Sequence, residues 1–152
     1  MLPISEVPVP GFDVPDHVRP VRDRVLAFMT ERVEPAEPVL HRGGEEAAAV
    51  LRDLQAQAKA EGLWALGHPT ELGGGGMPFA DYVFVNEVQG RSEYGQLALG
   101  TFTLQDSLML HAHASEAQRT RWLEPLVAAE IWPSFAMTEP DVASSDPTQL
   151  QT

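Results

Sequence analysis

The fold of this chain is decided by the stretch Phe135-Ala-Met-Thr-Glu-Pro-Asp-Val-Ala-Ser-Ser-Asp146. With Ile131 to Ser134 ahead of it, the run that ends at Met137 is rich in strand formers and too short for another helix, so it predicts a β element. Pro140 and the small residues after it turn the backbone, so that amides and hydroxyls can face a ligand. By physical chemistry alone, a solvated surface turn is the simpler interpretation of this loop.

Upstream of this stretch, the first helix is expected after an extended arm. Residues 1–15 contain four prolines and no periodic apolar face, which favours an arm over a helix. Asp16 is a candidate N-cap, and an apolar stripe from Val18 to Val33 predicts an amphipathic helix. Pro35 and Pro38 interrupt this pattern and are expected to end the helix.

A second helix and a glycine-rich loop come next. The stripe from Ala47 to Ala58 predicts a helix that Gly62 stops. Residues 63–77 include four consecutive glycines, Gly73 to Gly76, and are expected to be irregular backbone in a buried loop. These glycines lack the Lys and Ser/Thr of a phosphate-binding P-loop and do not open a βαβ unit. We therefore interpret them as a flexible turn beside a cleft.

Three further helices are expected before the deciding stretch. The apolar pattern over residues 79–90 predicts one helix, and the apolar run over 97–111 predicts a largely buried one. Ser115 and Gln118 form a capping box, which marks the start of a last helix. Pro125 is expected to kink that helix.

The expected fold is mainly α. It comprises an extended arm over residues 1–15, an all-α domain over 16–129 and the start of a β domain over 130–152. A single strand is not a stable unit, because its backbone donors and acceptors need a partner. We therefore expect further residues to complete the sheet, so that this chain is an incomplete N-terminal portion of a larger protein.

Composition and charge exclude several classes of function. The 152 residues include no cysteine, which excludes disulfides, thiolate metal sites and a cysteine nucleophile, and favours a reducing, cytoplasmic location. Asp and Glu number 22 against 10 Lys and Arg, for a formal charge of -12. Such a charge repels phosphate backbones and anionic lipid, so nucleic acid and membrane surfaces are poor partners. No segment is long and apolar enough to predict a targeting peptide or membrane span.

The deciding stretch resembles the flavin-contacting strand and loop of the acyl-CoA dehydrogenase family, where Thr-Glu-Pro is followed by small residues and Ser-Asp. Here these motifs are Thr138-Glu-Pro140 and Ser145-Asp146. Residues 110–118 and 122–126 resemble the family's helix pair before that strand, and Pro69-Thr-Glu-Leu-Gly-Gly74 resembles its glycine loop. The motifs occur in the family's order, and the resemblance covers the chain from about residue 18 onward.

The resemblance implies a fold that begins with the family's N-terminal helical domain and enters its central β domain. It also implies an FAD site. Phe135, Met137 and Thr138 would lie along the isoalloxazine ring, with the Thr138 hydroxyl near the reactive flavin nitrogen. Ser145 would contact the pyrophosphate or the acyl-CoA substrate. Because the loop between Pro140 and Ser145 is one residue longer than in most members, Ser144 and Ser145 are interchangeable candidates for cofactor binding.

The reaction implied by the resemblance is α,β-dehydrogenation of an acyl-CoA thioester in fatty acid metabolism. A carboxylate base removes the α proton, and the β hydrogen leaves as hydride to the flavin. In the family this base is a Glu of the C-terminal helical domain, so no catalytic residue is expected in this chain, which alone should be inactive. The resemblance further implies an electron-transfer flavoprotein or similar acceptor and a homo-oligomer of the full-length enzyme. The version of the loop found here resembles that of large multidomain members and their bacterial relatives.

One alternative function stays open from the residues themselves, and two further sets of residues are not expected to form a site. The chain could be a free-standing helical interaction module without chemistry, but such a module should have covered the apolar residues 131–137, which otherwise invite aggregation. His111 and His113 are two residues apart, so a helix would point them to different faces, and no metal site is expected. Glu71, Glu87 and Glu93 show no spacing that separates them from solvated glutamates.

Overall fold

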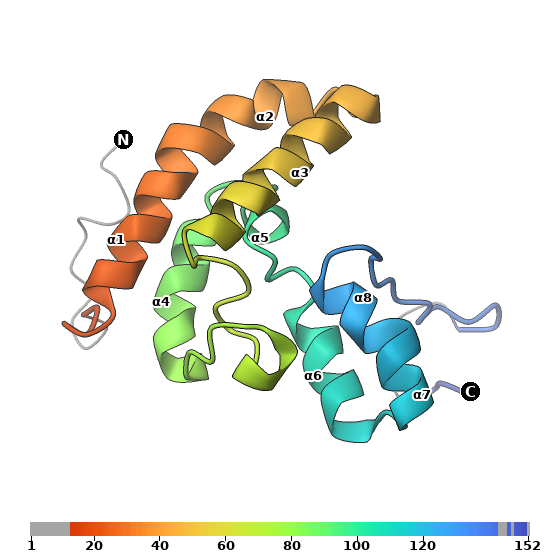
Figure 1. The fold of residues 1–152 in the computed structure, drawn as a ribbon. Helices are drawn as coiled ribbons and strands as arrows, with labels where there is room; N and C mark the ends of the chain where they lie inside the picture. The colour runs from red at the N-terminus through yellow and green to blue at the C-terminus, as the bar shows by residue number, and fades with distance from the viewer. Residues whose placement is uncertain (1–12, 143–145, 147, 152) are drawn as a thin grey trace.

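The computed structural model describes residues 13–142, 146 and 148–151. Two groups of helices make up this part of the chain, one from α1 to α5 and one from α6 to α8 (Figure 1). Within the described residues no strand is formed. The helical fold expected from the sequence is therefore confirmed, and several of its helices differ from the expected ones.

The first helix is longer than predicted. It comprises α1 (Arg19–Phe28), the π-helical segment η2 (Met29–Val33) and α2 (Glu34–Leu40) in one continuous run. Neither Pro35 nor Pro38 ends it: Pro38 lies inside α2, and Pro35 closely follows the π-helical segment, where the backbone bonding already departs from the regular α-helical pattern. The proposed cap is also wrong: the Asp16 carboxylate accepts a bond from Arg19 Nε at 3.1 Å, and the helix begins from Val18 without a side-chain cap.

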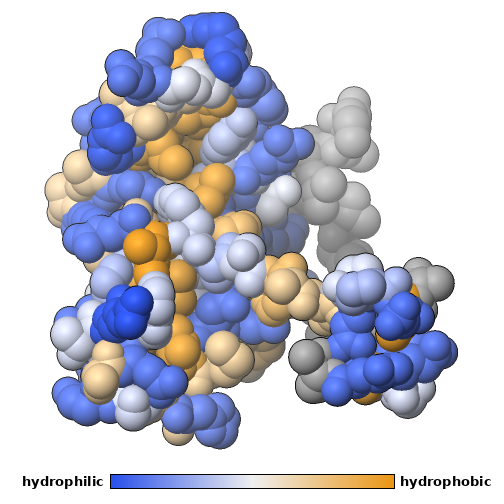
Figure 2. Space-filling model, turned by 90° about the vertical axis from the view of Figure 1, so that its right-hand side faces the viewer, coloured by the Kyte–Doolittle hydropathy of each residue, from blue (hydrophilic) through white to orange (hydrophobic). Residues whose placement is uncertain are grey.

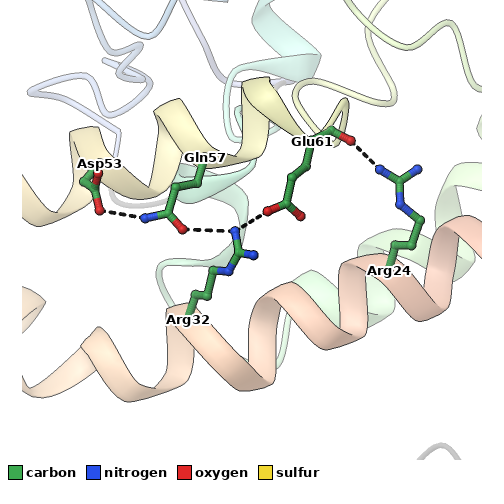
Figure 3. A network of polar contacts seen from close by, with 5 residues as sticks. All are labelled: Arg24, Arg32, Asp53, Gln57 and Glu61. Carbon is green, nitrogen blue, oxygen red and sulfur yellow. Dashed lines mark hydrogen bonds and ion pairs between the residues drawn. The ribbon is translucent and has the colours of Figure 1, made fainter.

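The second helix, α3 (Gly44–Ala60), runs back along the first and is joined to it by polar contacts (Figures 1 and 3). Arg32 donates to the Gln57 side chain at 3.0 Å and to the Glu61 carboxylate. Arg24 donates to the Glu61 carbonyl. Beneath this polar edge lies the apolar core of the first group, which buries Val25, Phe28, Met29, Val33, Leu54, Ala58, Leu63, Val85, Val88 and Leu99.

The glycine loop is packed rather than free, which corrects the interpretation of a flexible turn. After the short 3-10 helix η3 (Thr70–Leu72), Gly75 donates to the Ala65 carbonyl at 3.0 Å and Gly76 donates to the His68 carbonyl at 2.8 Å. A Cβ at Gly74 would lie 2.3 Å from the His68 carbonyl oxygen. Glycine is required here because backbone approaches backbone closely.

Helix α4 (Phe79–Gln89) forms as predicted, but the helix expected over 97–111 is two helices, α5 (Gly95–Ala98) and α6 (Leu104–His113). The break falls at Gly100, which has a φ of 70° and lies against the Trp64 ring. α6 is also mostly exposed, with Ser107 its one buried residue. An apolar composition therefore predicted burial that the structure does not show.

The last helix has the predicted capping box between Ser115 and Gln118. It consists of α7 (Glu116–Gln118), the π-helical segment η4 (Arg119–Leu123) and α8 (Glu124–Val127). A kink was expected at Pro125. The irregularity found near it is this π segment, which ends at Leu123, directly before Glu124 and Pro125. The same order, a five-residue π segment followed by Glu-Pro, occurs at η2 and Pro35.

Candidate functional site

The chain leaves the helices after α8, and the segment from residue 131 to 142 projects from the molecule (Figure 1). Residues 132–140 lie outside any helix or strand, so the strand predicted over 131–137 is not formed. The physical reason is that a strand needs a neighbouring strand for its hydrogen bonds, and the described residues supply none.

Three of the five predicted site residues lie together on this projecting segment. The Phe135 side chain is 69% exposed and that of Met137 is 48% exposed. Thr138 is also exposed. The remaining two, Ser144 and Ser145, lie outside the described residues. Exposed apolar side chains beside a hydroxyl fit the face and edge of a planar ligand, but this segment alone does not enclose one.

Contacts at both ends tether the segment. At its start, the Trp132 ring meets the Phe102 ring edge-on, with 6.0 Å between centroids. Toward its end, the Glu139 carboxylate accepts from the backbone N–H of Gln151 at 2.9 Å. The Asp146 carboxylate accepts from the Thr148 hydroxyl at 2.7 Å, and this bond lowers the pKa of Asp146. These polar contacts form a local turn that closes the segment on itself.

Apolar residues are exposed on this segment and elsewhere on the molecule. Figure 2 shows apolar surface between hydrophilic regions on the side of the molecule that carries α7, α8 and the C-terminal residues, with a small lobe joined to the main body by a narrow neck. From residue 100 onward, the large apolar residues that are over two fifths exposed are Phe102, Leu108, Met109, Trp122, Trp132, Phe135 and Met137. Exposed apolar patches of this kind mark interaction sites.

A buried polar group lies where the glycine loop meets α6, and the sequence analysis missed it. His68 is fully buried, its Nε2 is 3.3 Å from the Thr103 hydroxyl, and its Nδ1 has no partner among the described atoms. Burial lowers the pKa of His68 to about 4. Ser107 in α6 is likewise fully buried with its hydroxyl unpartnered. The one sequence signal for this packing is that His68 lies a few residues before the four glycines Gly73 to Gly76.

A second buried polar cluster stabilises the junction of α4 and α5. The Gln89 side-chain oxygen accepts from the Tyr82 hydroxyl at 3.1 Å and from the Thr101 hydroxyl at 2.6 Å. Burial raises the pKa of Tyr82, which keeps its hydroxyl protonated as the donor that Gln89 needs. This cluster has the character of a core support, since the bond between Gln89 and Thr101 joins α4 to the turn after α5.

A contact between a histidine and a carboxylate joins the glycine-loop region to α6. His111 Nε2 lies 3.3 Å from a Glu71 carboxylate oxygen. A backbone hydrogen bond and His111 lower the pKa of the exposed Glu71. His113 is exposed. No group of three His, Asp or Glu residues in the described part of the chain is arranged to hold a metal ion. No helix in the same part is long and apolar enough to cross a membrane.

Comparisons with known proteins agree on one family. Residues 15–130 match the family described as acyl-CoA dehydrogenase, N-terminal domain. Acyl-CoA dehydrogenase family member 10 of Mus musculus is 35% identical over 88% of this chain and 14% of its own length. The protein named as the acyl-CoA dehydrogenase FadE2 of Mycobacterium tuberculosis is 34% identical over 86% of this chain and 34% of its own.

A more distant relative and a solved structure extend this agreement. The (2S)-methylsuccinyl-CoA dehydrogenase of Cereibacter sphaeroides is 31% identical over 82% of this chain and 22% of its own length. A structure described as an acyl-CoA dehydrogenase from Mycobacterium abscessus superimposes with a TM-score of 0.77 at 32% identity, covering 92% of this chain and 38% of that one. The chain thus spans between 14% and 38% of the length of these proteins.

Proposed function

The chain belongs to the acyl-CoA dehydrogenase family, and from that premise we propose that it supplies the N-terminal helical domain of an FAD-dependent enzyme that dehydrogenates an acyl-CoA thioester. The observation that carries the proposal is the run Phe135 to Thr138, which begins five residues after the matched region ends and presents apolar side chains and a hydroxyl to the outside. FAD, when bound, accepts the β hydrogen of the substrate as hydride.

The chain's own residues act by binding and orientation. Phe135 and Met137 would supply apolar surface to the flavin ring, and the Thr138 hydroxyl would donate a hydrogen bond to it. Ser144 and Ser145 supply hydroxyls for a phosphate of the cofactor or of the acyl-CoA. The helices hold the start of this run, because Trp132 packs against Phe102 ahead of α6.

Partners and location follow from the same family. We expect an acyl-CoA substrate, an electron-transfer flavoprotein or similar acceptor, and a homo-oligomeric full-length enzyme. The absence of cysteine from the chain fits a reducing cytoplasm. Fractionation of the source cells with an antibody against the helical domain tests the location, since a membrane or extracellular signal would contradict it.

A matched pair of threonine variants tests the role of the run in the enzyme at its natural length. Thr138→Ala removes the proposed hydrogen bond and should slow flavin reduction by acyl-CoA about three- to tenfold, as a lost hydrogen bond of about 1 kcal/mol predicts. Thr120→Ala changes an exposed threonine of η4 and should leave the rate unchanged. Stopped-flow absorbance measures the rate of flavin reduction. Equal rates for both variants would show that Thr138 does not contribute to the flavin site.

A further inference from the structure

A polar seam joins α6 to residues 67–77, the loop region that contains the four glycines. Thr103, Ser107 and His111 follow each other at intervals of four residues, so they lie on one face of the helix. At the inner end of this face, His68 Nε2 is 3.3 Å from the Thr103 hydroxyl. At the outer end, His111 Nε2 is 3.3 Å from a Glu71 carboxylate oxygen. Ser107 is one helical turn from each contact, so the loop region lies along this whole face.

The inner end of the seam is closed to water. His68 and Ser107 have no exposed surface, and Thr103 is 2% exposed. The backbone of His68 is fixed as well, because its N–H donates to the Ala65 carbonyl at 2.9 Å and its carbonyl accepts from the Gly76 N–H at 2.8 Å. Water therefore reaches the imidazole only when the loop region moves away from α6.

The loop region depends on His68 for its attachment. His68 is the one buried residue from Gly67 to Met77, and every other residue of this stretch is half-buried or exposed. The glycines from Gly73 to Gly76 have no side chains to pack, and glycine loses more conformational freedom on folding than other residues. Segments with few buried contacts open at a lower free energy than the core. Burial of one imidazole therefore holds the loop region closed.

The inner seam suits a neutral imidazole and not a charged one. Nε2 of His68 faces the Thr103 hydroxyl, and its Nδ1 has no partner among the described atoms. A protonated imidazole carries two N–H donors, and here it would be buried with a single neutral partner. Burial of a charge without an anion is strongly unfavourable. Burial accordingly lowers the pKa of His68 to about 4.

No charged group around His68 offsets this cost in the described part of the chain. The carboxylates of α4 contact other partners, since Asp81 lies 3.0 Å from His17 and Glu87 lies 3.3 Å from Arg22. The remaining titratable groups near the seam are not bonded to His68; they are Glu71 in the loop region, Tyr82 in α4, and Asp106 and His111 in α6.

We propose that the seam is an acid-sensitive clasp: at neutral pH His68 holds residues 67–77 against α6, and its protonation releases this loop region while the helices stay folded. The outer contact does not prevent the release. Protonated His111 and Glu71 carry opposite charges, but the Glu71 side chain is 61% exposed, so solvent screens their attraction. The clasp is independent of the FAD-dependent reaction proposed above, so either can fail without the other.

Amide hydrogen exchange of the folded 152-residue chain, followed by NMR, measures the opening. The N–H groups of Gly76 and Met77 report on the loop region, because they donate to the carbonyls of His68 and Leu66. Their protection factors should fall about twentyfold from pH 7 to pH 5, since His68 titrates near 6.5 when exposed and near 4 when buried. Low urea should leave their exchange unchanged, and the amide of Val88, buried in α4, should stay better protected.

Two histidine variants decide whether His68 is responsible. In His68→Gln the loop protection factors should change less than about twofold between pH 7 and pH 5, because no imidazole is left to protonate. His113→Gln removes an exposed histidine of α6 and should keep the twentyfold fall. If His68→Gln does not fold, the unchanged chain still decides. Loop protection that is constant between pH 7 and pH 5, or equal to that of Val88 with the same urea dependence, would overturn the proposal, as would a twentyfold fall in His68→Gln.

Discussion

At the scale of single residues, His68 makes the stability of the fold depend on pH. Burial without an anionic partner lowers its pKa from 6.5 to about 4. The unfolded chain therefore binds a proton at His68 between these values while the folded chain does not. The contribution to stability is complete above about pH 6.5 and is lost as the pH falls toward 4, by up to about 3 kcal/mol.

Urea unfolding between about pH 7 and pH 4.5 checks this prediction. His68→Gln should show a shallower loss of stability with falling pH than the unchanged chain, because it has no imidazole to protonate. His113→Gln removes an exposed histidine and should keep the original pH dependence. If His68→Gln and the unchanged chain lose stability in parallel, burial of His68 does not control the pH dependence.

Gly74 provides a second prediction at this scale. A methyl group there would meet the His68 carbonyl oxygen at 2.3 Å, so Gly74→Ala should force the loop apart and destabilise the chain by about 1–3 kcal/mol. Gly90→Ala is the control, because its added Cβ would make only ordinary contacts from 3.5 Å outward. Thermal unfolding of both variants measures the difference, and equal melting temperatures would show that the glycine loop is not packed.

Some residue-level features were predictable and others were not. The capping box of Ser115 and Gln118 was predictable, because its two residues lie only three positions apart in the sequence. The contact between His68 and Thr103 spans 35 positions and depends on how the glycine loop folds against α6. Local sequence patterns carry no information on such a contact.

At the scale of elements, the two π segments explain why proline was a poor guide to where the first helix ends. Pro35 and Pro125 each follow a π segment and a glutamate, and in both places the helix continues past the proline. Apolar periodicity located α3 and α4 well because both bury one face in the first core. It failed for α6, whose apolar residues Leu108 and Met109 are left exposed.

This account predicts that Pro35 is tolerated rather than strained. Pro35→Ala should change the free energy of unfolding by less than about 1 kcal/mol, because the π segment ahead of it already departs from the regular α-helical hydrogen bonding. Ala56→Pro in the exposed middle of α3 should cost about 3 kcal/mol or more. Chemical denaturation of both variants checks the contrast, and a large loss from Pro35→Ala would contradict the role given to η2.

At the scale of the whole molecule, the family and the helical fold were predictable because the motifs at residues 69–74, 110–126 and 138–146 occur in a fixed order. The prediction of a strand over 131–137 was wrong, because β structure depends on a partner strand and not on composition alone. The projecting apolar segment favours a part of a flavoenzyme over a self-contained helical module, since a self-contained module would cover it.

The 152-residue chain by itself is predicted to be inactive. It presents one side of the proposed flavin site, and the family's catalytic base is expected elsewhere. With added FAD, an acyl-CoA and an artificial electron acceptor, the purified chain should give no bleaching of the acceptor above the protein-free control. Sustained bleaching that depends on the chain would mean that the catalytic base lies within it.

The most direct test is to isolate the protein that carries this sequence from its source cells, with an antibody against the helical domain, and to add acyl-CoA without oxygen. We predict a protein several-fold heavier than 16.6 kDa whose bound flavin bleaches on addition of acyl-CoA. A protein of 16.6 kDa without flavin would contradict the proposed enzyme and support an interaction module.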